Sequence, residues 1–392
     1  MGRALRRVTL LPLLKPLSSM RPITQADELK GKYVILRSSL NLPVEEGVVT
    51  NEYRLIKSLP TLRYLHEAGA KVILIGHIGR KPEETLKPVF TALEKHLPVH
   101  WGGLIGSTEC MERRELMGNG DILMLENTRQ DERETANDPD YAKEIASLGE
   151  LFVIDDFAVA HREQASVTGV AALLPSYAGL TMLQEIKKLS EVAKPTSPSL
   201  FIIGGAKFDT KMPLVEKYLN LYNHIFIGGA LVNDVLKAKG YEVGTSLLSD
   251  TSLDGAAFLD NPKLLLPVDL VVDGGATGKR TCELDQVQPD EAILDAGPKT
   301  VAMLREYINQ AATILWNGPF GNYEGGYVAA TEAVAKLIAA SDAQSVVGGG
   351  DTVAAIEKLG INDQFDHVSI GGGAMLEFLE KGTLPAIEAL GS

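Results

Sequence analysis

The chain lacks the short signatures by which metal sites, membrane spans and disulfide frameworks are usually identified. No stretch of the sequence approaches the ~18 unbroken apolar residues of a membrane span. CxxC and HExxH spacings are absent, so no structural zinc site is visible. Cys110 and Cys282 are the only thiols and lie far apart in sequence, which fits a reducing compartment better than a disulfide-stabilised secreted protein.

Several signatures of phosphate chemistry are missing as well. No GxGxxG follows an expected strand, which weakens the case for a dinucleotide dehydrogenase. The segment GGATGKR (274–280) has the wrong glycine spacing for a P-loop and carries arginine where that motif needs a hydroxyl. AHRE (160–163) lacks the aspartate of a protein-kinase catalytic loop, and there is no GxSxG elbow.

Basic charge is scarce overall and unevenly distributed. The formal net charge of −13 argues against a general nucleic-acid or anionic-membrane partner. Ten arginines lie within residues 21–194, whereas only Arg280 and Arg305 follow them. Because the guanidinium group matches the geometry of carboxylate and phosphate, this concentration predicts an anionic substrate in the first half of the chain.

The first twenty residues, MGRALRRVTLLPLLKPLSSM, carry basic residues and no acidic one. Their apolar run is short and is broken by Pro12. Two interpretations stay open: an extension that is disordered or precedes a true start at Met20, and an organellar transit peptide. We favour the first, and with it a cytoplasmic location.

Short apolar runs alternate with helical patterns along the rest of the chain. Runs such as KVILIG (71–76) and DLVV (269–272) are typical of buried strands, and helices are expected at 54–68, 86–97 and 139–148. The last of these begins with Asp138 as the N-cap and proline at the first helical position. This alternation predicts an α/β fold with parallel sheets that helices cover on both faces.

The chain divides into two expected lobes. We predict a first lobe over residues 21–177, completed by a C-terminal return at 376–392, and a second lobe over 194–375. An amphipathic helix at 178–193 joins them and is followed by the break KPTSPS. The expected architecture is two doubly wound, Rossmann-like parallel-sheet lobes connected by this helix and a hinge.

Glycine follows most of the strands expected in the second lobe. The turns read IIGGAK, FIGGAL, WNGPFG, VVGGGDT and SIGGGAM. Ligands of open α/β sheets bind outside the carboxyl ends of the strands, where bare backbone N–H groups and helix N-termini attract anions. The second lobe is therefore expected to bind a phosphate or a nucleotide.

Taken together, these segments resemble the phosphoglycerate kinase family over about residues 30 to 390. The matching strings of the first lobe include LRSSLNLPV (36–44), LENTR (125–129) and AHREQAS (160–166). Those of the second lobe include GGAKFDTK (204–211), WNGPFGNYE (316–324), GGGDT (348–352) and GGGAMLEFLE (371–380).

The resemblance implies that the first lobe binds 3-phosphoglycerate. The residues that match the family's basic substrate surface are Asn41, Arg54, His77, Arg80, Arg129, His161 and Arg162. A small molecule with a carboxylate and a phosphate needs several donors of this kind.

For the second lobe, the resemblance implies a site for ATP or ADP. Its matching residues are Gly205, Ala206, Lys207, Lys211, Gly229, Asn317, Pro319, Glu324, Gly350, Asp351 and Thr352. Glu324 is expected to bind the ribose hydroxyls, and Asp351 the Mg²⁺ ion, a hard cation that prefers carboxylate and phosphate oxygens.

The implied reaction is reversible phosphoryl transfer between 1,3-bisphosphoglycerate and ADP, a step of glycolysis and gluconeogenesis with a carboxyl group as the acceptor. That carboxylate is ionised near pH 7, so no general base is needed. The catalytic residues implied are Arg54, Lys211, Gly349 and Gly372. We expect a monomer with a hinge at 178–193 and at the C-terminal return, because closure would protect ATP from water.

The sequence departs from the family pattern near the expected substrate. Ser39 stands where the family has an aspartate, and Ile154 and Val159 replace polar residues. Asp156 stands where the family has alanine, and Ile370 where it has threonine. An active kinase is the favoured interpretation. The alternatives are a catalytically impaired nucleotide-binding protein of the same fold and a kinase for another small carboxylic acid.

Overall fold

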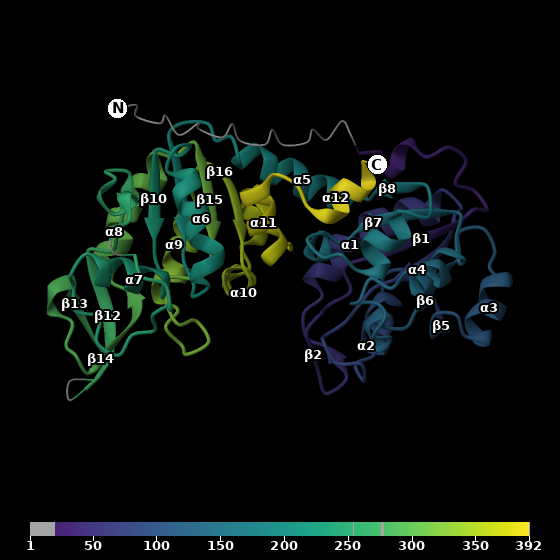
Figure 1. The fold of residues 1–392 in the computed structure, drawn as a ribbon, viewed down its shortest axis with the longest axis horizontal. Coiled ribbons are helices and arrows are strands. Elements are labelled where there is room, and N and C mark those ends of the chain that lie inside the picture. The colour runs from purple at the N-terminus through teal and green to yellow at the C-terminus, as the bar shows by residue number, and fades with distance from the viewer. Residues whose placement is uncertain (1–19, 254, 276–277, 392) are drawn as a thin grey trace, which may run out of the picture. The chain divides into compact units, whose positions relative to one another are not determined.

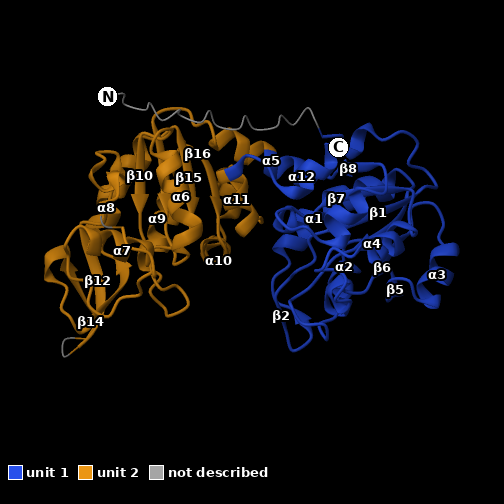
Figure 2. Ribbon diagram, in the orientation of Figure 1, with its two compact units in different colours: residues 1–186, 381–392 blue, residues 187–380 orange. Residues whose placement is uncertain are grey.

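The computed structural model describes residues 20–253, 255–275 and 278–391. They form two compact units. Unit 1 comprises the chain up to Ile186 together with the segment from Lys381 onward, and unit 2 is Lys187–Glu380 (Figure 2). The extension expected at residues 1–20 lies outside the described residues except for Met20, which is buried.

Unit 1 is built on a six-stranded parallel sheet in the order β5-β6-β4-β1-β7-β8 (Figure 1). Its strands are β1 (Tyr33–Ser38), β4 (Lys71–Ile75), β5 (His100–Gly103), β6 (Ile122–Leu125), β7 (Leu151–Asp155) and β8 (Ser176–Ala178). Its first helices are α1 (Tyr53–Glu67), α2 (Lys87–Leu93), α3 (Thr108–Glu115) and α4 (Pro139–Ala146). A hairpin of β2 (Val44–Glu45) and β3 (Val48–Val49) follows β1.

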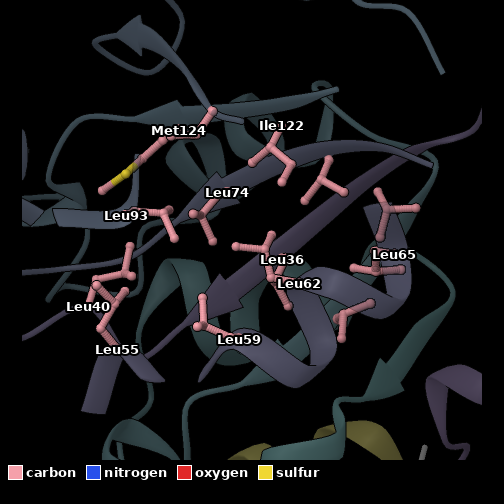
Figure 3. Packing of buried hydrophobic residues seen from close by; sticks show 14 of the residues in the cluster. Leu36, Leu40, Leu55, Leu59, Leu62, Leu65, Leu74, Leu93, Ile122 and Met124 are labelled. Atoms are coloured by element: carbon pink, nitrogen blue, oxygen red, sulfur yellow. The ribbon is translucent and has the colours of Figure 1, made fainter. Parts of the chain in front are cut away.

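The core of unit 1 joins α1 to the central strands of this sheet. Leu55, Leu59 and Leu62 repeat at helical spacing along α1 and are buried. Figure 3 shows Leu59 and Leu62 beside Leu36 of β1, with Leu74 of β4 close by. Burying each leucine stabilises the fold by roughly 1.5–3 kcal/mol, so this packing fixes the strands whose carboxyl ends carry the polar residues discussed below.

Local sequence signals account for the helix ends. The Asp138 side chain accepts hydrogen bonds from the backbone N–H groups of Asp140 and Tyr141, which confirms the N-cap predicted for α4. Helix α2 ends at Leu93 rather than at the predicted residue 97. Turns at residues 94–96 follow it, and Pro98 keeps Leu97 out of the helix, because proline disfavours helical backbone in the residue before it.

Unit 2 contains a second six-stranded parallel sheet, in the order β11-β10-β9-β15-β16-β17. Its strands are β9 (Ser199–Ile203), β10 (His224–Ile227), β11 (Leu264–Leu265), β15 (Thr313–Asn317), β16 (Gln344–Gly348) and β17 (His367–Val368). Its helices are α6 (Phe208–Tyr218), α7 (Leu231–Ala238), α8 (Pro298–Gln310), α9 (Ala329–Ala339), α10 (Gly350–Leu359) and α11 (Gly373–Lys381). The predicted α/β fold class with two parallel sheets is confirmed.

Three strands of unit 2 form a separate sheet. Residues 269–272 were expected to continue the parallel series, and this is wrong. They belong to β12 (Asp269–Gly274), which pairs antiparallel with β13 (Arg280–Glu283) and β14 (Glu291–Ala296) in a three-stranded sheet. The physical reason is chain proximity, because short connections between neighbouring segments favour antiparallel pairing.

Helix α5 (Leu180–Val192) covers most of the segment expected to join the lobes, and the division between the units falls within it, after Ile186. The final helix, α12 (Pro385–Leu390), belongs to unit 1, where the N–H of Ala386 donates to the carbonyl of Ala160. Within the described residues, no helix combines the length and apolar character needed to cross a bilayer.

Candidate active site

The predicted substrate residues of unit 1 follow four neighbouring strands of its sheet, in the order β6-β4-β1-β7. Asn41 follows β1, His77 follows β4 and Arg129 follows β6. His161 and Arg162 follow β7, after a short 3-10 helix. Since parallel strands end at the same edge of a sheet, the structure brings these residues to one edge.

Hydrogen bonds tie three of these loops together around Gly79. The N–H of Gly79 donates to Oδ1 of Asn41 over 2.9 Å, and its carbonyl accepts from Nη1 of Arg129 over 2.5 Å. Nearby, Oε2 of Glu84 accepts from the N–H groups of Arg80 and Lys81. Hydrogen bonds between side chains and backbone therefore hold these loops in place before any ligand binds.

Arg129 retains unused hydrogen-bonding capacity at this edge. Its Nε and Nη2 atoms are buried and have no hydrogen-bond partner among the described residues. Burial, followed by repulsion from Arg162 and Arg37, lowers the pKa of Arg129 to about 10. A buried guanidinium with unused donors is costly, so this position favours the arrival of an anion.

His77 lies among the arginines and is only 4% exposed. Burial lowers its pKa well below the usual value, and repulsion from Arg37, Arg129, Arg162 and Arg54 lowers it further. His77 is therefore neutral in the physiological range. The same effects show that Arg54 belongs to the cluster, whereas Arg80 is exposed at its rim.

Arg37 was not among the predicted site residues, yet it organises the floor of the cluster. It is fully buried within β1, and its Nη1 lies 2.7 Å from Oδ2 of Asp156. Its Nε donates to Oγ of Ser166, and its Nη2 lies 2.9 Å from Nδ1 of His77. An arginine inside an otherwise apolar strand was the sequence signal for this role, because a buried charge requires partners.

The structure also clarifies the departures from the family pattern. Ser38 pairs with Asp155 in the β1–β7 register, so Ser39 and Asp156 both follow that pair. The counter-ion of Arg37 is Asp156, while the Oγ of Ser39 and the Oδ1 of Asp156 are buried without a hydrogen-bond partner among the described residues. Relative to the family pattern, this chain thus lacks a carboxylate at position 39 and has an additional one, Asp156, after the neighbouring strand.

Two other departures lie in the core. Ile154 is fully buried within β7, and Val159 is 2% exposed. Both side chains therefore contribute to packing in unit 1. Ile370 is similarly buried, in the loop after β17 of unit 2.

In unit 2, five consecutive strands of the parallel sheet end in glycine turns. The turns follow β10, β9, β15, β16 and β17, which are neighbours in the sheet in that order. Backbone bonds join the turns: the N–H of Gly205 donates to the carbonyl of Pro319, and that of Gly229 to the carbonyl of Phe320. The predicted nucleotide residues on these turns therefore share one edge.

Glycine occupies these turn positions for two different structural reasons. A Cβ on Gly204 would collide with the carbonyl of Pro319, and one on Gly229 with the backbone of Gly205. Those glycines allow the turns to pack against one another. A Cβ on Gly350 or Gly372 would meet no atom within 4 Å, so the space beside them is open.

Lys211 lies beneath the turns and is only 5% exposed. Its ammonium group donates to the carbonyl of Gly204. Burial, followed by repulsion from Lys207, lowers the pKa of Lys211 to about 8, while Asp351 opposes the shift. A partly desolvated cation here would interact strongly with phosphate oxygens.

A cavity of about 280 Å³ opens at the same edge. Six predicted residues line it: Gly205, Ala206, Gly229, Pro319, Glu324 and Asp351. Sequence reasoning missed the opposite wall, which includes Leu247, Leu270, Ile293 and Leu294. Most of that wall comes from β12 and β14. Burial alternates along most of β14, but its sequence, EAILDA, does not alternate apolar and polar residues, so periodicity gave no sign of an antiparallel strand.

Asn233 is a further cavity residue that sequence reasoning missed. It lies in α7 and is fully buried, and its Nδ2 donates to the carbonyl of Leu247. Its Oδ1 has no hydrogen-bond partner within the described part of the chain. The cavity therefore combines apolar walls with an unused acceptor, as expected of a site for a heteroaromatic ring.

The other predicted residues of unit 2 lie around this cavity rather than in its lining. They are Lys207, Lys211, Asn317, Gly349, Gly350, Thr352 and Gly372. Asn317 is buried and its Nδ2 contacts Sδ of Met375, while Thr352 is buried and its Oγ1 bonds none of the described residues. Lys207 is exposed in the loop that precedes α6.

Asp351 is suited to a hard cation. Its exposed carboxylate lies in the first turn of α10, directly after the glycine turn of β16. No group of three or more His, Cys, Asp or Glu side chains able to hold a metal occurs in the described part of the chain. One carboxylate fits a Mg²⁺ ion whose remaining ligands are phosphate oxygens and water.

The chain was compared with known proteins. The family model described as phosphoglycerate kinase matches residues 23–382. A phosphoglycerate kinase from Thermus thermophilus is 43% identical, over 95% of this chain and 100% of that protein.

Solved structures agree with this match. Phosphoglycerate kinase from Coxiella burnetii superposes with a TM-score of 0.81 at 36% identity, and that from Pyrococcus horikoshii with 0.83 at 30%. Each comparison covers 95% of this chain and 98% of the other. With a family match over most of its length and relatives of this similarity, the chain belongs to the phosphoglycerate kinase family.

Proposed function

We propose that this chain catalyses reversible phosphoryl transfer between ATP and the carboxylate of 3-phosphoglycerate, giving ADP and 1,3-bisphosphoglycerate. The observation that carries the proposal is the arginine cluster of unit 1. There, Arg129 keeps two buried donors without a partner among the described residues, beside a neutral His77 and three further arginines. Such a site is suited to a small molecule with two anionic groups.

Unit 2 would bind the nucleotide. We assign the base to the apolar cavity, the ribose to Glu324, and the phosphates to the glycine turn that precedes α10. The open space beside Gly350 allows a phosphate to approach the backbone N–H groups at the start of this helix. Asp351 would hold Mg²⁺, which supplies positive charge to the phosphate oxygens when it is bound.

Chemistry at this site would depend on orientation and charge rather than on a base. The attacking carboxylate is already ionised at neutral pH. Lys211, with its lowered pKa, would stabilise the negative charge of the moving phosphoryl group, and Arg54 would act from the side of the acceptor. The backbone N–H groups of Gly349 and Gly372 are the remaining proposed donors.

A steady-state assay with 3-phosphoglycerate and MgATP tests the proposal. Turnover of roughly 1–100 s⁻¹ would support it, since kinases usually fall in that range. Nucleotide binding without turnover would overturn it in favour of an impaired member of the family. Turnover with another small carboxylic acid, but not with 3-phosphoglycerate, would move the assignment to a different acceptor.

The hinge expected at residues 178–193 and in the C-terminal return remains part of the proposal, as does the monomeric state. Small-angle scattering on the full chain, with each substrate alone and with both, tests the hinge. A radius of gyration that is unchanged by both substrates together would contradict it. Mass photometry on the same sample tests the monomer.

A further inference from the structure

We infer that Arg37 fixes His77 as a neutral imidazole with its proton on Nε2, so that His77 offers the substrate an uncharged hydrogen-bond donor. The tautomer follows from contacts within unit 1. Its use by a substrate rests on the proposed function.

The argument begins with the contact between Nη2 of Arg37 and Nδ1 of His77, which are 2.9 Å apart. A guanidinium carries only donors and has no acceptor atom. If Nδ1 also carried a proton, two N–H groups would face each other at hydrogen-bonding distance. Nδ1 must therefore accept, and in a neutral ring the proton then resides on Nε2.

Arg37 cannot easily turn away from this contact, because its other nitrogens are occupied. Nη1 donates to Oδ2 of Asp156 and to the carbonyl of Ser38, and Nε donates to Oγ of Ser166. Ser166 is in turn held by Glu134, whose carboxylate accepts from both its N–H and its hydroxyl. The guanidinium is therefore fixed on three sides within a buried network.

The charges around His77 oppose its protonation. Arg37, Arg129, Arg162 and Arg54 all act on it, while Asp156 forms an ion pair with Arg37. No described residue bonds Nε2 of His77, the atom that carries the proton in this assignment. A neutral donor adds a hydrogen bond for an anion without adding a further charge to four nearby arginines.

Arg37 and Asp156 are thus positioning residues that act through His77. Asp156 stands where the family pattern has alanine, so this chain achieves the arrangement with its own choice of counter-ion. The consequence for binding is specific. Affinity for the acceptor should not depend on titration of His77 anywhere between pH 5.5 and 7.5.

Long-range ¹H–¹⁵N spectra of the ¹⁵N-labelled full chain test the tautomer directly. The sequence has seven histidines, and His77 is identified as the signal lost in His77→Gln. We expect the Nε2–H pattern of a neutral ring at both pH 5.5 and pH 7.5. A ring that becomes protonated within this range, or that carries its proton on Nδ1, would overturn the inference.

The role of Arg37 is tested with Arg37→Gln/Asp156→Asn, which removes both buried charges together and so avoids leaving one unpaired. Because an amide can accept as well as donate, the Nδ1–H tautomer of His77 should become populated in this variant, while burial and the three remaining arginines keep the ring neutral. In Arg37→Lys, which keeps a donor-only group, the proton should stay on Nε2. The exposed Arg63→Gln is the matched control. If the proton stays wholly on Nε2 in the double variant, the role of Arg37 is refuted.

Kinetics connect this inference to the substrate. The substrate phosphate itself titrates at about pH 6, so KM for 3-phosphoglycerate is compared at pH 7.5, where that phosphate is almost fully ionised. We expect this KM to rise several-fold in the double variant, which loses the fixed Nε2 donor, and to rise less in Arg37→Lys, which keeps it. Equal rises in the two variants contradict the donor role. Absence of turnover in the native chain would refute the proposed function, while the spectra would still decide the tautomer.

Discussion

The two units place their candidate sites at the same structural position, the carboxyl edge of a six-stranded parallel sheet, but build them from different groups. Unit 1 uses charged side chains around His77, supported by a buried ion pair. Unit 2 uses mainly backbone, with glycine turns that pack on one another above one buried lysine. Substitutions should therefore affect charge balance in unit 1 and steric fit in unit 2.

The largest effect is expected from breaking the ion pair of unit 1. Asp156→Ala leaves Arg37 buried without its counter-ion and should lower the free energy of unfolding by about 3–5 kcal/mol. Urea denaturation measures this. Adding Ser39→Asp places a carboxylate across the strand pair and should recover a large part of the loss. Strictly additive effects of the two changes would mean that Ser39 and Asp156 do not share a function.

Removing the buried cation of unit 2, Lys211, should lower kcat rather than the free energy of unfolding. Lys211→Ala is expected to lower kcat by ~10²–10³-fold with little change in KM for ATP, because the charge acts on the transition state. The exposed Lys336→Ala in α9 is the control. If instead only KM for ATP rises, Lys211 binds the ground state and its assigned role is wrong.

Substituting two glycines of unit 2 should distinguish a glycine needed for packing from one that leaves space for a ligand. Gly229→Ala meets the backbone of Gly205 at a positive φ and should destabilise the fold by roughly 2–4 kcal/mol. Gly350→Ala meets open space, so unfolding should change by less than about 1 kcal/mol while KM for ATP rises ~10-fold. Equal effects of the two changes on unfolding would remove the distinction between these glycines.

The smallest effect is a pH dependence that should arise in unit 2 and not in unit 1. Lys211 is charged below a pKa of about 8, so kcat/KM for MgATP should fall as the pH rises through that value. Lys211→Arg should remove this alkaline limb. Because the folded pKa lies below the unfolded value, Lys211 favours folding increasingly as the pH rises from about 8 towards 10.5, and denaturation across that range checks the sign.

Part of the fold and of the candidate site could be predicted from the sequence because it depends on local signals. The alternation of apolar runs and helical patterns gave the parallel sheets, and Asp138-Pro139 gave the start of α4. The arginine excess in the first half of the chain pointed to the cluster now located around His77. Motif matches indicated the glycine turns of unit 2.

Other features could not be predicted because they depend on which segments become neighbours. Residues 269–272 have the composition of a buried strand, but their partners are β13 and β14, and only that pairing creates the far wall of the cavity. Asn233 looked like an ordinary helix residue until its side chain proved to line that cavity. Long-range pairing is not encoded in the periodicity of one segment.

The sequence by itself therefore determined the fold class, the family and the kinds of groups at each sheet edge, because periodicity, composition and motifs are local properties. Only the tertiary structure decided how those groups are used. The β1–β7 register made Asp156 the counter-ion of Arg37, and the resulting network assigned a proton to Nε2 of His77. The packing of one turn on another likewise decided which glycines serve the fold and which leave room for a ligand.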